Sequence, residues 1–575
     1  MGLGTDEALC PDLERYSLWS IHPYLLERPP STSRSITSFH LDIARVFENP
    51  PKGWQLRQLK QVGLDRWFIR EVRALFRSEP GDEKDEPGEP REPKIQWLEL
   101  SQEGMEQTEG RVLKPELLSQ ASIGVLRMTK DGPVVEVIAR SRMTVSALVS
   151  KAGMLLVLFE LQASRTKKRR ALSLAQAMRI NYLAAHADVG HRRLSPGEQQ
   201  LLVLPHAIAS KLRQRVRDLG ESETRVQGRF PEAEGQVAVP IEPEHLEQCY
   251  GLTVHNLEIT FTGSASLELP SLHMTVRDAF MSRLPDCKPY LGFRGRLPVA
   301  THIVLPWDER LQGPEADARA AAADLEEVES AAARCMRHPA GSGIAPPLAS
   351  QPQREEFQTI PFGPLRRIHV SSEAFVAFTV SQTEFERNAW DSRIGSEYLT
   401  TYLLALHQAM FCQNLSWLSY FEALQENRRN NEELVRLFEE YTTQYDFSVV
   451  SNQLAIQGLY RAARSTLGVE KLVPELREEL RAWLDSELRN EQRSLNSIAV
   501  VVLLLSLATV FINLNLTVFS KDAWIDAWPE SFGLAALEAL WLWVPTLLVV
   551  FVSISSSKIR EHFARVIQLL FGRRK

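Results

Sequence analysis

The chain has 575 residues, of which 44% are hydrophobic and 24% are charged, with a formal net charge of −6. This composition excludes a collagen, a disulfide mini-scaffold and a wholly disordered chain, and the small net charge gives no reason to expect direct nucleic-acid binding. The five cysteines are scattered, which fits reduced cytosolic thiols better than a disulfide framework or a zinc cluster. No apolar segment opens the chain, so we expect no signal peptide and a cytosolic N-terminus.

Residues 1–312 mix short runs of alternating polarity with helical stretches, and predict a cytosolic α+β domain. A segment rich in proline, glycine and acidic residues, 78–94, interrupts this domain and is expected to be an exposed loop. We expect helices at 54–77 and 171–218. Strands are expected at 95–100, 124–130, 134–139, 252–263 and 302–306.

Residues 313–355 combine an alanine- and glutamate-rich stretch, expected to be a solvent-facing helix, with a flexible linker. Residues 356–495 predict a helical bundle that ends in a long stalk. Along the stalk, leucines from Leu472 to Leu495 form an apolar stripe of the kind that packs against other helices, as in a coiled coil.

Two apolar runs near the C-terminus predict transmembrane helices at 498–519 and 534–554, within a membrane part at 496–557. The tail at 558–575 is basic, whereas the loop between the two runs holds Lys521 as its single basic residue. Because basic residues favour the cytosolic side, we expect a protein of the cell (inner) membrane with two spans, cytosolic termini and an external loop.

This layout resembles the CorA family of metal-ion transporters over roughly the last 180 residues. The resemblance implies a homopentamer, an environment in a lipid bilayer, a pore lined by the first span, and Mg²⁺ as a transported ion rather than a cofactor. The family's Gly-Met-Asn signature is absent, since the corresponding stretch reads Phe511-Ile512-Asn513-Leu514-Asn515. CorA-like effectors of type III CRISPR antiviral defence also join such a membrane part to a divergent sensor domain.

The first span carries a polar stripe. At 100° per residue five of its hydroxyl and amide side chains fall within about 80° on one face, while Asn515 points the opposite way. This stripe suits a water-filled pore, although such groups also bond helix carbonyls or neighbouring helices. The predicted pore-lining residues are Ser506, Thr509, Asn513, Thr517 and Ser520. An acidic external mouth, or simply a solvated acidic loop, is predicted from Asp522, Asp526, Glu530 and Glu538.

A basic region lies between Arg165 and Arg217. It could bind a nucleotide-like ligand or anionic lipid headgroups through its cationic side chains, or it could be a solvated face balanced by acidic residues elsewhere. Its candidate binding residues are Arg165, Lys167, Lys168, Arg169, Arg170, Arg192, Arg193, Arg213 and Arg215. The sequence holds no motif of a soluble enzyme, such as a Walker A loop or a G-x-S-x-G elbow, so no enzymatic activity is expected.

The leading hypothesis is therefore a CorA-like oligomeric channel or transporter for divalent cations, magnesium first. One alternative is a membrane effector gated by a nucleotide-like cytosolic signal. The other is a membrane-anchored scaffold without a pore. Ion flux separates the first two from the third, and a requirement for a nucleotide separates the second from the first.

Overall fold

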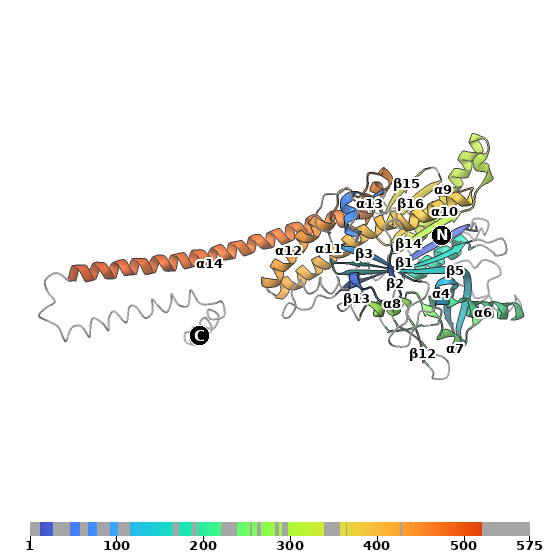
Figure 1. The fold of residues 1–575 in the computed structure, drawn as a ribbon, viewed down its shortest axis with the longest axis horizontal. Coiled ribbons are helices and arrows are strands. Elements are labelled where there is room, and N and C mark those ends of the chain that lie inside the picture. The colour runs from blue at the N-terminus through green and yellow to red at the C-terminus, as the bar shows by residue number, and fades with distance from the viewer. Residues whose placement is uncertain are drawn as a thin grey trace, which may run out of the picture. The chain divides into compact units, whose positions relative to one another are not determined.

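A computed structural model divides the chain into two units, Met1–Pro474 and Glu475–Lys575, which are described separately. Figure 1 shows the described elements as ribbons. The residues whose placement the structure describes are 12–26, 46–57, 67–76, 93–101, 115–164, 172–186, 191–194, 196–219, 238–253, 256–260, 266–281, 287–289, 297–337, 357–363, 365–425 and 428–519.

The first unit is built on a large mixed sheet with the order β10-β8-β4-β5-β6-β1-β14-β17-β16-β15. Along this order all neighbours are antiparallel except β14 and β17, which run parallel. Four further strands branch from this order, since β3 and β9 pair with β5, β2 pairs with β3, and β13 pairs with β1. Strands β7, β11 and β12 form a separate sheet. The strands are β1 Arg15–Leu26, β2 Trp54–Leu56, β3 Ile95–Leu100, β4 Ala121–Thr129, β5 Gly132–Ser150, β6 Met154–Ser164, β7 His191–Arg193, β8 Gln199–Pro205, β9 Val239–Pro240, β10 Tyr250–Gly251, β11 Asn256–Thr260, β12 Ser266–Leu269, β13 Cys287–Pro289, β14 Val299–Leu305, β15 Phe357–Pro361, β16 Arg366–Ser371 and β17 Ala374–Val380.

Strand β5 joins two parts of the large sheet because it is 19 residues long. Its first half pairs with β4, and its second half, from Arg142 to Ser150, pairs with β6. Two apolar clusters fill the space around these parts, one on the central strands and one beneath β4 and β8.

Alternate residues of the central strands face different helices. Tyr16 and Thr301 face α5, where Asn181 accepts a hydrogen bond from the Tyr16 hydroxyl at 2.6 Å and donates one to Thr301 at 2.7 Å. Their strand neighbours Ser17 and His302 face α10 instead. A strand alternates its side chains between the two faces of a sheet, so helices cover both faces of this one. Figure 1 shows α8 on one side of the sheet and α11 on the other.

The helices after the sheet follow one another closely along the chain. A π-helical turn joins α10 to α11, so that residues 384–425 form one continuous helical run. The helical elements are α3 Arg70–Phe76, α4 Pro115–Ser119, α5 Leu174–Ala185, α6 His206–Leu219, α7 Pro243–Leu246, α8 Leu272–Met281, η3 Glu309–Gln312, α9 Glu315–Arg337, α10 Glu384–Arg393, η5 Ile394–Tyr398, α11 Leu399–Gln425, α12 Arg428–Tyr445, α13 Leu454–Thr466 and α14 Val469–Phe519.

The long helix α14 has 51 residues. Its predicted apolar stripe divides by exposure, since Leu476 and Leu480 are buried, whereas Leu488 and Leu495 are exposed. Among the residues whose side chains the structure describes, which leave out most of 498–519, no helix combines the length and the apolarity that crossing a membrane requires.

Some predicted elements are confirmed and others are wrong. The strand predicted at 95–100 is β3, and the strand predicted at 302–306 overlaps β14. The helix predicted at 54–77 is wrong in its first part, which holds β2, and the helix predicted at 171–218 is interrupted by β7 and β8.

The segment predicted to be helical, 356–495, is also wrong at its start. Three strands, β15 to β17, occupy it, and β17 pairs with β14. The large sheet therefore continues beyond residue 312, where the predicted α+β domain ended. Residues 77–92, which hold most of the predicted acidic loop, lie outside the described part.

Candidate functional site

One face of the helical run 384–425 carries the polar side of the candidate site. Asn388, Asp391, Ser392 and Gly395 follow the spacing i, i+3, i+4 and i+7, which places them on one side of a helix. Thr383 caps the start of α10 by accepting a hydrogen bond from the backbone N–H of Glu386 at 3.2 Å. The π-helical turn that follows is a local irregularity of a kind often found at functional sites.

The opposing side of the site comes from three neighbouring strands. Register places Gln162 of β6, Ser17 of β1 and His302 of β14 directly opposite one another. The adjacent row pairs Glu160 with Trp19. These polar residues lie on the face that α10 covers, where an unpaired polar group would be costly. The sheet register therefore creates a requirement for a polar partner on the helix.

Asp391 is that partner, and it accepts four hydrogen bonds. Its Oδ1 atom accepts from Ser17 at 3.2 Å and from Nδ1 of His302 at 2.9 Å. Its Oδ2 atom accepts from Gln162 at 2.5 Å and from Arg15 at 3.2 Å. Burial opposes ionisation of this carboxyl, but the hydrogen bond and charge of His302, the charge of Arg15 and the hydrogen bond from Ser17 outweigh it, so the pKa of Asp391 is lowered.

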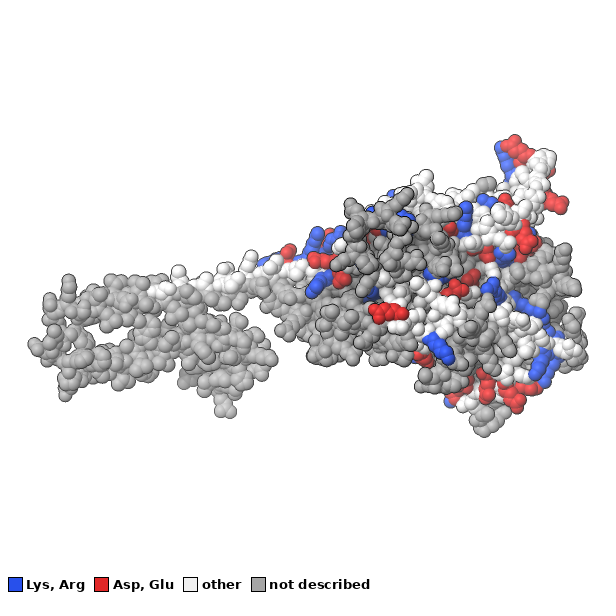
Figure 2. All heavy atoms as spheres, in the orientation of Figure 1, with Lys and Arg blue, Asp and Glu red and all other residues white. Residues whose placement is uncertain are grey.

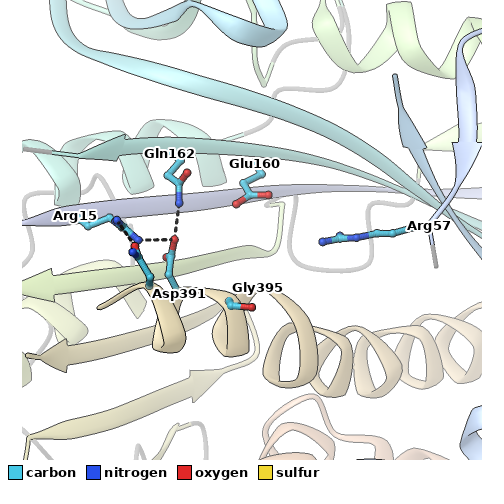
Figure 3. A pocket seen from close by; sticks show the side chains of 8 residues that line it. Arg15, Arg57, Glu160, Gln162, Asp391 and Gly395 are labelled. Atoms are coloured by element: carbon cyan, nitrogen blue, oxygen red, sulfur yellow. Dashed lines mark hydrogen bonds and ion pairs between the residues drawn. The ribbon is translucent and has the colours of Figure 1, made fainter. Parts of the chain in front are cut away.

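A pocket of about 370 Å³ lies beside this cluster. Figure 3 shows Arg15, Gln162 and Asp391 joined at one end of it, while Glu160 and Arg57 face the remaining space without a direct bond between them. The Arg57 guanidinium lies over the Trp97 ring at 5.1 Å, and its Nε is 3.5 Å from Glu99. The pocket is lined by Arg15, Arg57, Glu160, Gln162, Asn388, Asp391, Ser392 and Gly395.

The pKa of Glu160 shifts in the opposite direction to the pKa of Asp391. Burial raises its pKa to about 7, and the charges of Asp391 and Glu99 act in the same direction. The charge of Arg57 and a hydrogen bond from Trp19 oppose this rise without cancelling it. Glu160 therefore changes its charge near neutral pH, whereas Asp391 stays ionised.

The site offers polar recognition rather than an evident reaction centre. Thr379, His302 and Asp391 stand in the order of a nucleophilic triad, with 2.9 Å between the Thr379 hydroxyl and Nε2 of His302. However, Thr379 is 2% exposed and His302 is fully buried, and neither lines the pocket. Within the described ranges, no group of three or more histidine, cysteine, aspartate or glutamate residues could hold a metal ion.

The predicted pore residues fall partly on α14. This helix extends to Phe519 and so includes Ser506, Thr509, Asn513 and Thr517 in its sequence. Ser506 is exposed, and the side chains of the other three lie outside the described part. The second predicted span, the loop, the tail, Ser520 and all four predicted mouth residues, Asp522, Asp526, Glu530 and Glu538, also lie outside it.

The predicted basic region is distributed over separate elements. Arg193, on β7, pairs with Glu258 at 3.3 Å, and Arg215, on α6, pairs with Glu242 at 2.5 Å. Strand β7 belongs to the three-stranded sheet, whereas α6 packs on the large one. Arg213 lies on α6, and residues 165–171 and the Arg192 side chain are outside the described part. On the face seen in Figure 2, acidic and basic side chains of the coloured residues are interspersed.

Sequence reasoning missed every residue that lines the pocket, although two signals were present. One is the polar spacing from Asn388 to Gly395 at the start of a helical run. The other is a charged residue inside an apolar strand, as Glu160 is within β6. Either pattern alone also fits a solvated surface, so neither identifies a site without the tertiary structure.

Comparison of the chain with known proteins identifies no relative. No protein-family model, no curated protein and no solved structure matches this chain.

Proposed function

We propose that the chain is a CorA-like oligomeric membrane channel or transporter for divalent cations, with magnesium as the first candidate. The observation that carries this proposal is that residues 498–519 hold no charged side chain and continue a helix that begins at Val469. At about 1.5 Å per residue this run would measure roughly 33 Å, the thickness of a bilayer core. The proposal treats α14 as the stalk and the first span together.

Exposed leucines on α14 support the oligomeric part of the proposal. Leu488, Leu495 and Leu503 are 55%, 63% and 62% exposed in the single chain. At 100° per residue they fall within about 80° on one face of the helix. An apolar stripe of this kind is typical of a surface that another helix covers.

The oligomer can be tested by placing a charge on this stripe. Changing Leu488 and Leu495 together to Asp should reduce the particle mass measured by light scattering in detergent, because each carboxylate would be buried in an apolar seam. Ser486→Asp is the matched control, since Ser486 is exposed and lies on the opposite side of the helix. An unchanged mass in the double variant would contradict assembly through this stripe.

The pore can be tested with two chemically identical residues. Asn513 lies on the polar stripe of α14 and Asn515 on the opposite side. Asn513→Leu should block Mg²⁺ flux into liposomes by creating a hydrophobic constriction, whereas Asn515→Leu should change flux much less. Equal flux from both variants would show that this stripe does not line a pore.

A second candidate function is a membrane effector gated by a nucleotide-like cytosolic signal. The polar pocket under α10 favours gating by a small cytosolic ligand, but its lining offers no side chain on which a nucleobase could stack. The basic region predicted for that role gives less support, because Arg193 and Arg215 already pair with glutamates. Flux that appears only after a nucleotide is added would favour this candidate over a plain transporter. The absence of flux under both conditions would leave a membrane-anchored scaffold.

A further inference from the structure

The pocket under α10 contains two opposite charges that the protein does not pair with each other. Most of its other polar groups are occupied, since Asp391 accepts four hydrogen bonds and Arg15 donates to Asp391 and to Asn388. Glu160 and Arg57 face the open part of the pocket instead, and no bond joins them in Figure 3. Arg57 keeps its ion pair with Glu99 through Nε at 3.5 Å, and in the open part of the pocket its charge and that of Glu160 can each meet a further group of opposite charge.

Both side chains are held in place from behind. Trp19 donates a hydrogen bond to Glu160, and Gly395 allows the helix to approach Trp19, because a Cβ atom at Gly395 would lie 3.2 Å from Cζ2 of Trp19. The Arg57 guanidinium lies over the Trp97 ring and forms an ion pair with Glu99. The Nε–Oε2 distance of that pair is 3.5 Å, and among the described residues no hydrogen bond to Nε is formed. Such support limits the motion of both groups before any ligand arrives.

The lining and the volume of the pocket restrict the chemical character and the size of a ligand. All eight lining residues are polar, charged or glycine, so the lining offers no aromatic or aliphatic side chain on which a nucleobase could stack. Asn388 and Ser392 are exposed and leave the pocket open to solvent on the side of α10. A volume of about 370 Å³ is at the small end of the range for ligand pockets.

We propose that this pocket binds a small zwitterion of the α-amino-acid class, whose ammonium group pairs with Glu160 and whose carboxylate pairs with Arg57. A guanidinium and a carboxylate form a strong charge-assisted pair, and the ammonium completes the second pair at the opposite wall. The inference concerns binding to the first unit of the chain and does not depend on ion transport.

Binding should depend on pH in a direction that identifies the ligand class. The groups acting on Glu160 are Arg57 beside β2, Trp19 on β1, Glu99 on β3 and Asp391 on α10, and its pKa is about 7. An ammonium needs ionised Glu160, so affinity should rise about tenfold between pH 6 and pH 8. A ligand with a carboxylate alone should bind more tightly at pH 6, where Glu160 is protonated and can donate a hydrogen bond.

The experiment is calorimetric titration of the full-length protein in detergent with the proteinogenic α-amino acids, one at a time. Acetate and ethanolamine serve as probes that carry a single charge. At least one small polar amino acid should bind, and both single-charge probes should bind at least about tenfold more weakly. Failure of every amino acid to bind at millimolar concentration would overturn the proposal, as would acetate binding as tightly as the best amino acid.

Variants test the assignment of the two charges. Glu160→Gln and Arg57→Gln should each weaken binding at pH 8 at least about tenfold. Arg193→Gln, on the separate three-stranded sheet, is the control and should leave affinity unchanged. Thermal unfolding at pH 8 shows whether each variant is folded, and unchanged binding by a folded Glu160→Gln protein would contradict the proposed role of Glu160. A failure of ion flux would not affect these outcomes, because the measurement is binding.

Discussion

Two carboxyl groups that line the same pocket, one on α10 and one on β6, behave in opposite ways. Asp391 and Glu160 both line the pocket, yet the pKa of Asp391 is lowered and that of Glu160 is raised to about 7. Burial opposes ionisation of both groups, so burial alone does not explain the difference. Asp391 accepts four hydrogen bonds, two of them from Arg15 and His302, whereas Glu160 receives a hydrogen bond from Trp19 and faces Arg57 across open space.

The difference shows that the number and the charge of donors decide whether a buried carboxyl remains ionised. The Asp391 cluster has its polar groups paired and fastens α10 to the sheet. The pair formed by Glu160 and Arg57 is incomplete, and an incomplete polar pair is one that a ligand can complete. Four variants would break or sharpen this comparison.

The largest effect is expected from Asp391→Ala. This change removes the carboxylate that Ser17 and Gln162 bond, and one of the two side-chain partners of Arg15 and of the buried His302. It should lower the free energy of unfolding by about 3–5 kcal/mol. Urea unfolding of the full-length protein, followed by tryptophan fluorescence, measures it. Asp324→Ala is the control, because Asp324 pairs with Arg310 at an exposed position and should cost less than about 1 kcal/mol. A loss of similar size in both variants would contradict a special role for the Asp391 cluster.

Gly395→Ala should have the next largest effect. The added Cβ would lie 3.2 Å from Trp19, so the tryptophan that donates to Glu160 must shift, at a cost of about 1–3 kcal/mol. Gly458→Ala is the matched control in α13, where a Cβ meets nothing within 4 Å and alanine should stabilise the helix by about 0.5–1 kcal/mol. If the two substitutions change the unfolding temperature in the same direction, close packing at Gly395 is not important.

Glu160→Gln should stabilise the protein at pH 8 by about 1–2 kcal/mol and change it little at pH 5. The pKa of Glu160 is raised on folding, so its protonated form is favoured in the folded state. That contribution is fully present below the ordinary pKa of glutamate and is lost as the pH rises through about 7. Unfolding temperatures from pH 5 to pH 8 would show a flatter profile in the variant, and Glu315→Gln, at an exposed helix position, should match the wild type.

The smallest effect is expected from Ser17→Ala, which removes one of the four donors to Asp391 and should cost about 0.5–1.5 kcal/mol. Because the pKa of Asp391 is lowered on folding, its contribution is present above the ordinary pKa of aspartate and is lost as the pH falls through the lowered value. The variant should therefore lose stability at a higher pH during acid unfolding. A loss as large as that from Asp391→Ala would mean that the four donors act as one unit.

The sequence predicted the elements whose signal is local. Strand 95–100 stands out by its composition, and the alanine-rich stretch forms α9 from Glu315 to Arg337. From Glu384 onward, the helical patterns correspond to α10 through α14. The uncharged run at 498–519 is likewise a property of the sequence alone, and the prediction that it spans a membrane rests on that property.

The tertiary structure decided what depends on pairing between distant segments. Almost all of the 12 residues of strand β1 are buried, because helices cover both faces of the central sheet. The strand therefore lacks the alternation of polar and apolar residues by which a sequence reveals a half-buried strand. The pocket joins Arg15, Arg57, Glu160 and the segment 388–395, which are far apart in the chain. Sheet register and the approach of α10 bring them together, and neither can be read from local periodicity, because both depend on which segments pair across the whole domain.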